Sequence, residues 1–135
     1  MKTIDPIAAQ LPGILAALPQ DTPIVMVNLL KFREQAHYKQ GEDACSGREA
    51  YRRYSAVAIK KVNDVGGKPI YLGQVRGLLI APADEQWDEV LLVRYPSAQA
   101  FASMLADPDY RAATRHRTAA LEDARLIATT QNGLS

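Results

Sequence analysis

The sequence predicts an α+β fold in which helices cover one face of a four-stranded antiparallel sheet. Two stretches, Ile24–Phe32 (IVMVNLLKF) and Trp87–Tyr95 (WDEVLLVRY), are nearly continuous in apolar residues. Such stretches are typical of central strands. Helical apolar spacing follows each of them. The 135 residues suit one domain with a buried core, and we expect an N-terminal helical extension (1–20) before a core at 24–130.

The N-terminal extension carries a helix start signal at Asp5-Pro6. Asp is a favoured N-cap and Pro suits the first helical position. Apolar residues follow at 7, 11, 14, 15 and 18, and Pro12-Gly13 is expected to divide this helix into two short pieces.

Residues 33–46 are polar and show no periodicity, which predicts a long loop that acts as a lid or is the most mobile internal segment. Ser46 and Glu49 form a capping-box pattern, so a helix should begin at Gly47 and end at Gly66-Gly67. Lys68–Ile80 is predicted to be the second strand and to form a long hairpin with the strand that begins at Trp87.

The last third of the sequence predicts two helical segments and a final strand. Ser97 is a cap signal, Asp107-Pro108 is another, and the second segment should run to about Leu121 before a strand at 125–130. The order after the first helix is β-α-β-β-α-α-β, which is the split βαβ or ferredoxin-like arrangement. Right-handed crossovers place the helices on one side of that sheet.

The two central strands are apolar on both faces, although the helices of one chain cover only one face. The other face would then expose an apolar surface to water, so we expect a homodimer in which two copies pack sheet to sheet.

Composition argues against several other partners. Sixteen Lys and Arg nearly balance fifteen Asp and Glu, and a net charge of +1 favours neither nucleic acid nor an anionic membrane. The N-terminal apolar residues are interrupted by polar residues, Pro and Gly, unlike a signal peptide or a membrane span. Cys45 is the one cysteine, which fits a reducing compartment. We expect a cytoplasmic protein.

Several segments together resemble the family called domain of unknown function 1330, in the dimeric α+β barrel superfamily. They are VNLLKF, SGREAYRRY, VGGKPIYLG, WDEVLLVRYPSAQAF and ADPDYRAATRHRTAALEDARLIA. The resemblance covers roughly residues 24–130 and implies the ferredoxin-like fold and a dimer. Relatives in the superfamily include cofactor-free monooxygenases, isomerases, haem-degrading enzymes and stress-response proteins, so the resemblance does not choose an activity.

The haem-degrading branch is similar in one residue and differs in another. Asn28 matches its first-strand Asn, but Thr114 stands where its helical His is expected, and His116 comes two residues later. Two residues rotate a helical side chain by about 200°. Haem ligation by His116 is therefore not expected, and we predict no cofactor.

Asn28 and His116 are the candidate catalytic residues. Asn28 lies on an apolar strand and needs hydrogen-bond partners, from a ligand that it orients or from the backbone or a tyrosine in a structural role. His116 lies between Arg115 and Arg117. Neighbouring cations would favour the neutral ring of a general base, whereas a solvated basic helix face is the structural alternative.

Tyr51, Tyr54, Tyr71 and Arg94 are the candidate ligand-binding residues. The tyrosines are expected at the helix–sheet interface, as ligand contacts or as core residues. Arg94, inside a central strand, needs an anionic ligand or a carboxylate, for example Asp88 or Glu89 of a second copy.

The remaining chemistry is sparse. Cys45 precedes a helix, which lowers a thiol pKa, but only His37 is near it in sequence as a base. The two His and one Cys have no metal-ligand spacing. Three hypotheses stay open: a cofactor-independent enzyme (monooxygenase- or isomerase-like) acting on a small apolar or aromatic metabolite, a non-catalytic small-molecule-binding or stress-associated module, and a purely structural dimer.

Overall fold

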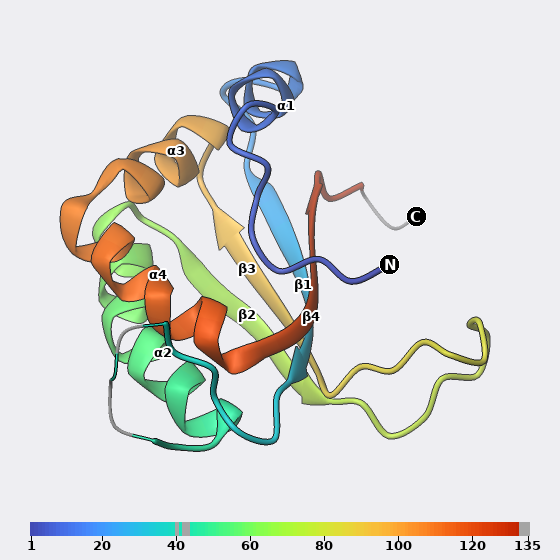
Figure 1. Ribbon diagram of the computed structural model, residues 1–135. Coiled ribbons are helices and arrows are strands. Elements are labelled where there is room, and N and C mark those ends of the chain that lie inside the picture. Colours follow the sequence, from blue (N-terminus) through green and yellow to red (C-terminus); the bar gives the residue numbers. More distant parts are fainter. Residues whose placement is uncertain (40, 42–43, 133–135) are drawn as a thin grey trace.

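The computed structural model describes residues 1–39, 41 and 44–132, and its centre is one antiparallel sheet (Figure 1). The strands are β1 (Ile24–Phe32), β2 (Lys68–Gln74), β3 (Glu89–Tyr95) and β4 (Leu121–Thr129). Their order across the sheet is β2-β3-β1-β4, so the two most apolar strands lie in the middle. This is the ferredoxin-like arrangement, and the predicted fold class is confirmed.

Three helices cover one face of the sheet: α2 (Gly47–Asp64), α3 (Ala98–Ala106) and α4 (Pro108–Ala120) (Figure 1). Each begins at a predicted cap. Side-chain oxygens of Ser46, Ser97 and Asp107 accept hydrogen bonds from backbone N–H groups of the first turn at 3.0, 3.1 and 2.8 Å. These bonds satisfy donors that a helix N-terminus leaves without a partner.

The N-terminal helix differs from the prediction. α1 spans Leu11–Ala17 with Gln10 at its N-cap, so Pro12 belongs to its first turn and does not break it. Proline is tolerated there because the first N–H groups of a helix have no partner within the helix. Asp5 does not cap a helix; its carboxylate instead accepts a hydrogen bond from the Thr118 hydroxyl at 2.9 Å.

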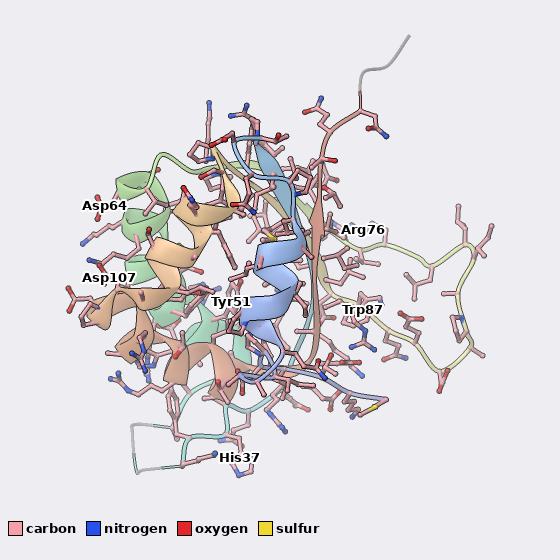
Figure 2. The ribbon with its side chains drawn as sticks, turned by 90° about the horizontal axis from the view of Figure 1, so that it is seen from above. His37, Tyr51, Asp64, Arg76, Trp87 and Asp107 are labelled. Atoms are coloured by element: carbon pink, nitrogen blue, oxygen red, sulfur yellow. The ribbon has the colours of Figure 1, made fainter. Side chains whose placement is uncertain are left out.

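The predicted long hairpin is wrong beyond Gln74. The last pairing bond of this hairpin is donated by Val75 N to Asp88 O at 2.9 Å. Residues 76–86, here called the arm, belong to no strand and project from the sheet on the side opposite the helices (Figures 1 and 2). Arg76 and Trp87 mark its base in Figure 2. Leu79 and Ile80 on the arm are 99% and 98% exposed, so a single chain gives them nothing to pack against.

The loop between β1 and α2 is docked where it is described. Ala36 N donates to Cys45 O and His37 N to Ala119 O, both at 2.9 Å. The Tyr38 hydroxyl lies 2.6 Å from Nδ1 of His116. Backbone and aromatic contacts therefore hold these residues although the loop has no apolar periodicity, and the mobility of residues 33–46 stays a prediction. Residues 40, 42 and 43, which the same expectation included, lie outside the described residues.

Two buried clusters fill the space between sheet and helices. The first surrounds Met26, with Val93, Phe101 and Met104, and the second surrounds Leu30, with other residues of α2, α4 and β4. Side chains alternate along β1, so Asn28 shares the helix-facing side with Met26 and Leu30 and stands between the clusters. A polar side chain therefore lies between the two apolar clusters of the core.

Candidate functional site: a cavity between the helices and the sheet

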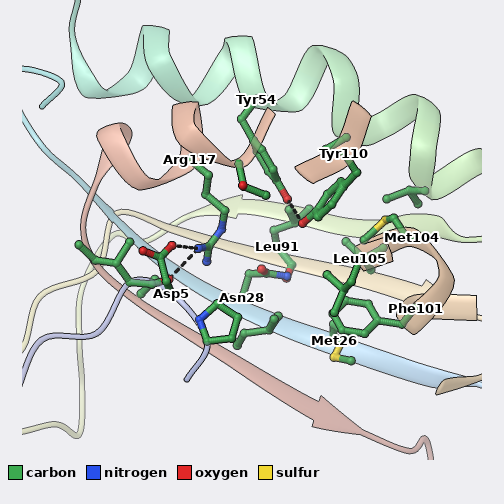
Figure 3. Close-up of a pocket in the computed structure, with 18 of the residues that line it drawn as sticks. Asp5, Met26, Asn28, Tyr54, Leu91, Phe101, Met104, Leu105, Tyr110 and Arg117 are labelled. Carbon is green, nitrogen blue, oxygen red and sulfur yellow. Dashed lines mark hydrogen bonds and ion pairs between the residues drawn. The ribbon is translucent and has the colours of Figure 1, made fainter. Parts of the chain in front are cut away.

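A cavity of about 1480 Å³, partly open to solvent, lies between the helix-facing side of the sheet and the helices. The N-terminal segment (residues 3–18) lines one part of it, and all four strands together with α2, α3 and α4 contribute the rest (Figure 3). Part of the wall is apolar and is formed by Met26, Leu91, Phe101, Met104 and Leu105. Concave, largely apolar sites with a few fixed polar groups are typical of small-molecule binding.

Asn28 lies on the floor of this cavity beside Leu91 (Figure 3). Its Nδ2 donates to the backbone carbonyl of Leu91 at 3.1 Å, which is the structural partner that sequence reasoning left open. Among the described residues, no group donates a hydrogen bond to Asn28 Oδ1. The amide is therefore fixed at one end and offers an acceptor at the other.

Four tyrosines line the same cavity, and two of them, Tyr51 and Tyr54, were predicted; the others are Tyr95 and Tyr110. Tyr54 and Tyr110 share a hydrogen bond between their hydroxyl groups at 2.8 Å, and the Tyr51 ring packs against Tyr54 at 5.3 Å. Burial raises the pKa of Tyr51 to about 12, although the charge of Arg117 acts in the opposite direction. Burial and the neighbouring phenols also raise the pKa of Tyr54 well above its usual value. These groups are neutral phenols at physiological pH.

Arg117 is the cavity residue that sequence reasoning missed. Its side chain is 12% exposed, donates to Ile4 O at 2.7 Å, and lies 3.9 Å from an Asp5 carboxylate oxygen. The signal was present in the sequence: Arg117 follows Tyr110 by seven residues, which places both on one face of α4. His116 was predicted because histidine in general suits acid–base chemistry, although it is one residue off this face.

The predicted residues His116, Tyr71 and Arg94 do not line the cavity. His116 contacts Tyr38 on the outer side of α4, with ring centroids 5.5 Å apart. Tyr71 and Arg94 pair in register with Leu92 and Val25, whose side chains point to the opposite, open face of the sheet. Only Asn28, Tyr51 and Tyr54 of the predicted site residues come together. The alternation along a strand separates the others, since neighbouring residues face opposite sides.

Glu89 is the carboxylate of β3 that lines the cavity, and it too was not predicted. Arg48 of α2 lies 3.7 Å from it. Burial raises the pKa of Glu89, while the charge of Arg48 acts to lower it. A carboxyl group with these two opposing influences is a candidate proton acceptor.

The described residues were searched for metal-ligand clusters and for helices that could cross a membrane. Within residues 1–39, 41 and 44–132, no three His, Cys, Asp or Glu side chains lie close enough together to hold a metal ion. Cys45 is a free thiol of intermediate exposure. In the same part of the chain, no helix is both long and apolar enough to cross a membrane.

Comparison with known proteins supplies the family. The family model for the domain of unknown function 1330 (DUF1330) matches residues 42–130, more than half of the chain. The chain belongs to this family. A crystal structure of RPA0582, a protein of unknown function from Rhodopseudomonas palustris, is 38% identical with a TM-score of 0.91. That match covers 99% of this chain and 100% of that one.

More distant structures share the fold alone. A dimeric ferredoxin-like protein of unknown function from Bacteroides fragilis is 11% identical with a TM-score of 0.53, covering 84% of this chain and 100% of that chain. A hydroxynitrile lyase from Passiflora edulis is 11% identical with a TM-score of 0.55, covering 85% and 98%. Comparison with curated proteins found no match. These similarities establish the fold of this DUF1330 protein, and its activity has to be inferred from its own cavity.

Proposed function

We propose that this DUF1330 protein binds a small, largely apolar or aromatic metabolite in the cavity between helices and sheet. The observation that carries the proposal is the half-satisfied amide of Asn28, which is held by Leu91 O and presents Oδ1 to a largely apolar cavity. Asn28 is half-buried, and its Oδ1 accepts no hydrogen bond from the described residues, so a ligand N–H or O–H donor, or water, should complete it. The neutral phenols of Tyr51 and Tyr54 offer further aromatic contact.

The binding proposal is tested by filling the cavity. Leu91→Trp places a larger side chain beside Asn28, and Lys60→Trp adds the same side chain on the exposed surface of α2 as a matched control. A library of small aromatic compounds is screened by ligand-observed NMR, together with native mass spectrometry of the purified protein. We expect Leu91→Trp to lower the affinity for these compounds at least tenfold and the control variant to bind them with unchanged affinity. Equal binding to both variants would place the site elsewhere.

We also propose that the protein is a homodimer formed through the open face of the sheet. Tyr71 and Ile127 on that face are 55% and 48% exposed, and the arm adds the fully exposed Leu79 and Ile80. Contiguous exposed apolar surface of this kind usually marks an interface. One of the fold neighbours is described as dimeric, which supports the proposal by analogy. Sedimentation at micromolar concentration should give twice the chain mass.

An enzymatic role is the second candidate, and Glu89 is the observation that favours it. A cofactor-independent reaction that begins with proton abstraction needs a base in the cavity, and burial raises the pKa of this carboxyl toward the useful range. Arg117 could face the negative charge that develops on the ligand. Carbonyl compounds found to bind are incubated in D₂O: deuterium uptake with wild type and not with Glu89→Gln supports catalysis. Binding without uptake in wild type leaves a binding protein.

A further inference from the structure

Arg117 is a largely buried cation whose hydrogen bonds are mostly unused. A guanidinium has five N–H donors. In the described part of the chain, Arg117 makes one hydrogen bond, from NH1 to Ile4 O at 2.7 Å. Burying a charged group is costly unless it is paired and hydrogen-bonded. Figure 3 shows this side chain reaching from α4 into the cavity, above Asn28.

Asp5 only partly compensates this charge. Its nearest oxygen lies 3.9 Å from Arg117 NH1, beyond hydrogen-bonding distance, and the same oxygen accepts from the Thr118 hydroxyl. The Asp5 side chain is 52% exposed. The backbone beside it is fixed, since Thr3 bonds to Asp123 and Ala124 of β4, so an exchange of partners needs only the exposed Asp5 side chain to move. An anion with better geometry could therefore replace Asp5 as the partner of Arg117.

Three other arginines of the cavity wall already lie beside carboxylates: Arg48 lies 3.7 Å from Glu89, Arg52 lies 2.9 Å from Glu49, and Arg125 lies 2.6 Å from Asp123. Arg111 also lines the cavity but is exposed on α4. One largely buried guanidinium matches a singly charged anion better than a dianionic phosphate, which normally recruits several cations. Arg binds a carboxylate with two parallel hydrogen bonds, which fixes orientation as well as charge. The apolar wall around Phe101 and Met104 lies farther along the same cavity (Figure 3).

We propose that the cavity takes a small monocarboxylate with an apolar or aromatic body, and that Arg117 binds the carboxylate in the place that Asp5 approaches when no ligand is bound. The acid group lies at the N-terminal segment, the body extends toward Phe101 and Met104, and a donor on the ligand reaches Asn28 Oδ1. This inference rests on the proposed binding function and specifies its ligand class. Asp5 acts as an intramolecular competitor, so it lowers the affinity for carboxylates.

The test compares acids with their neutral amides. Benzoate, phenylacetate and cinnamate are titrated beside benzamide, phenylacetamide and cinnamamide, with ligand-observed NMR as the readout. Wild type should bind the acids at least tenfold more tightly than the amides. Arg117→Gln should remove that preference, Arg117→Lys should retain part of it through charge alone, and Asp5→Asn should raise acid affinity about threefold to tenfold. Lys60→Gln, which removes an exposed positive charge of α2, should leave the preference intact.

Each outcome decides between the two proposals. If amides bind as tightly as acids and Leu91→Trp still blocks both, the carboxylate inference is overturned and the cavity function stands. If neither series binds wild type at millimolar concentration, both proposals fail. An acid preference that survives Arg117→Gln assigns the anion to another residue and also overturns the inference. Should Arg117→Gln not fold, the Asp5→Asn variant decides: unchanged acid affinity there contradicts competition by Asp5.

Discussion

The two faces of the sheet use the same strands for different purposes. On β1, Met26, Asn28 and Leu30 face the helices, and Val25, Val27 and Leu29 face the open side. The helix-facing side holds polar groups at fixed positions within apolar surroundings, such as the Asn28 amide on Leu91 O. The centre of the open side is aliphatic and uniform. A surface with oriented polar groups can discriminate among small molecules, whereas a uniform apolar surface is suited to association.

The edge of the open face differs from its centre. Lys31 pairs with Glu122 and Arg125 with Asp123, both at 2.6 Å, and Arg94 is exposed at the other end of the sheet, opposite Val25. An apolar centre with a charged rim is the usual anatomy of a protein interface. Arg94 therefore has a place at the rim of the proposed dimer and not at the ligand.

The largest expected effect comes from placing a charge at the centre of the open face. Leu92→Lys should convert the dimer to monomer, because two-fold symmetry would bury two unpaired ammonium groups, each costing several kcal/mol. We expect a loss of roughly 5 kcal/mol of dimerisation free energy, measured by sedimentation velocity. Lys60→Gln on the outer surface of α2 is the control and should stay dimeric. A wild-type protein that is monomeric at micromolar concentration contradicts the proposed interface.

A second prediction separates core from arm. Phe101 is 5% exposed and packs edge-on against Tyr95 at 5.1 Å, so Phe101→Ala should lower the free energy of unfolding by about 3–5 kcal/mol. Ile80→Ala on the arm should change monomer stability by less than about 0.5 kcal/mol, because a side chain that is 98% exposed loses no contact. Urea denaturation in the Leu92→Lys background measures both. A large effect of Ile80→Ala there would show that the arm packs within its own chain.

Sequence patterns predicted the elements whose signals are local. The caps at Ser46, Ser97 and Asp107 and the apolar strands depend on neighbouring residues, and the structure agrees. Patterns failed where distant residues decide. Asp5-Pro6 has the form of a helix start, but Arg117 and Thr118, more than a hundred positions away, draw the Asp5 carboxylate to α4. Ile80 continues an apolar run, yet no strand lies beside it within the chain.

The candidate site was predictable only in part for the same reason. Asn28, Tyr51 and Tyr54 were predictable because each is a residue with a polar group on an otherwise apolar face of its strand or helix. To predict Arg117 as a cavity residue, one has to follow the helical spacing of α4 for two turns from Tyr110. The rarity of histidine, which favoured His116, was a weaker guide to the site than this spacing. The side of the sheet on which Tyr71 lies could be predicted only from the strand pairing itself, because a bulge between Pro69 and Tyr71 shifts the register against β3.

A third prediction concerns alkaline pH and the buried phenols of the helix-facing side. Burial raises the pKa of Tyr51 to about 12 in the folded chain, against a model-peptide value of about 10. A raised folded pKa contributes stability that is fully present below pH 10 and is lost as pH rises toward 12. The free energy of unfolding should fall by roughly 1–3 kcal/mol across this interval, and Tyr51→Phe should reduce the fall. Denaturant melts at pH 9, 10 and 11, with tyrosinate absorbance as a second readout, check it; an identical fall in Tyr51→Phe contradicts it.

The last prediction concerns a small effect on stability at Asn28, and it distinguishes the two roles of this amide. Asn28→Leu removes the bond to Leu91 O but also removes an unpaired Oδ1 from an apolar chamber, so the losses and gains nearly cancel. We expect the free energy of unfolding to change by less than about 1 kcal/mol, while compounds that bind wild type lose at least tenfold in affinity. Asn63→Leu on the exposed end of α2 is the matched control and should bind as wild type. A loss of about 1–3 kcal/mol in Asn28→Leu with ligand affinity intact would instead make the amide a structural bridge between β1 and β3, because only then does the Leu91 carbonyl lose a partner that the fold requires.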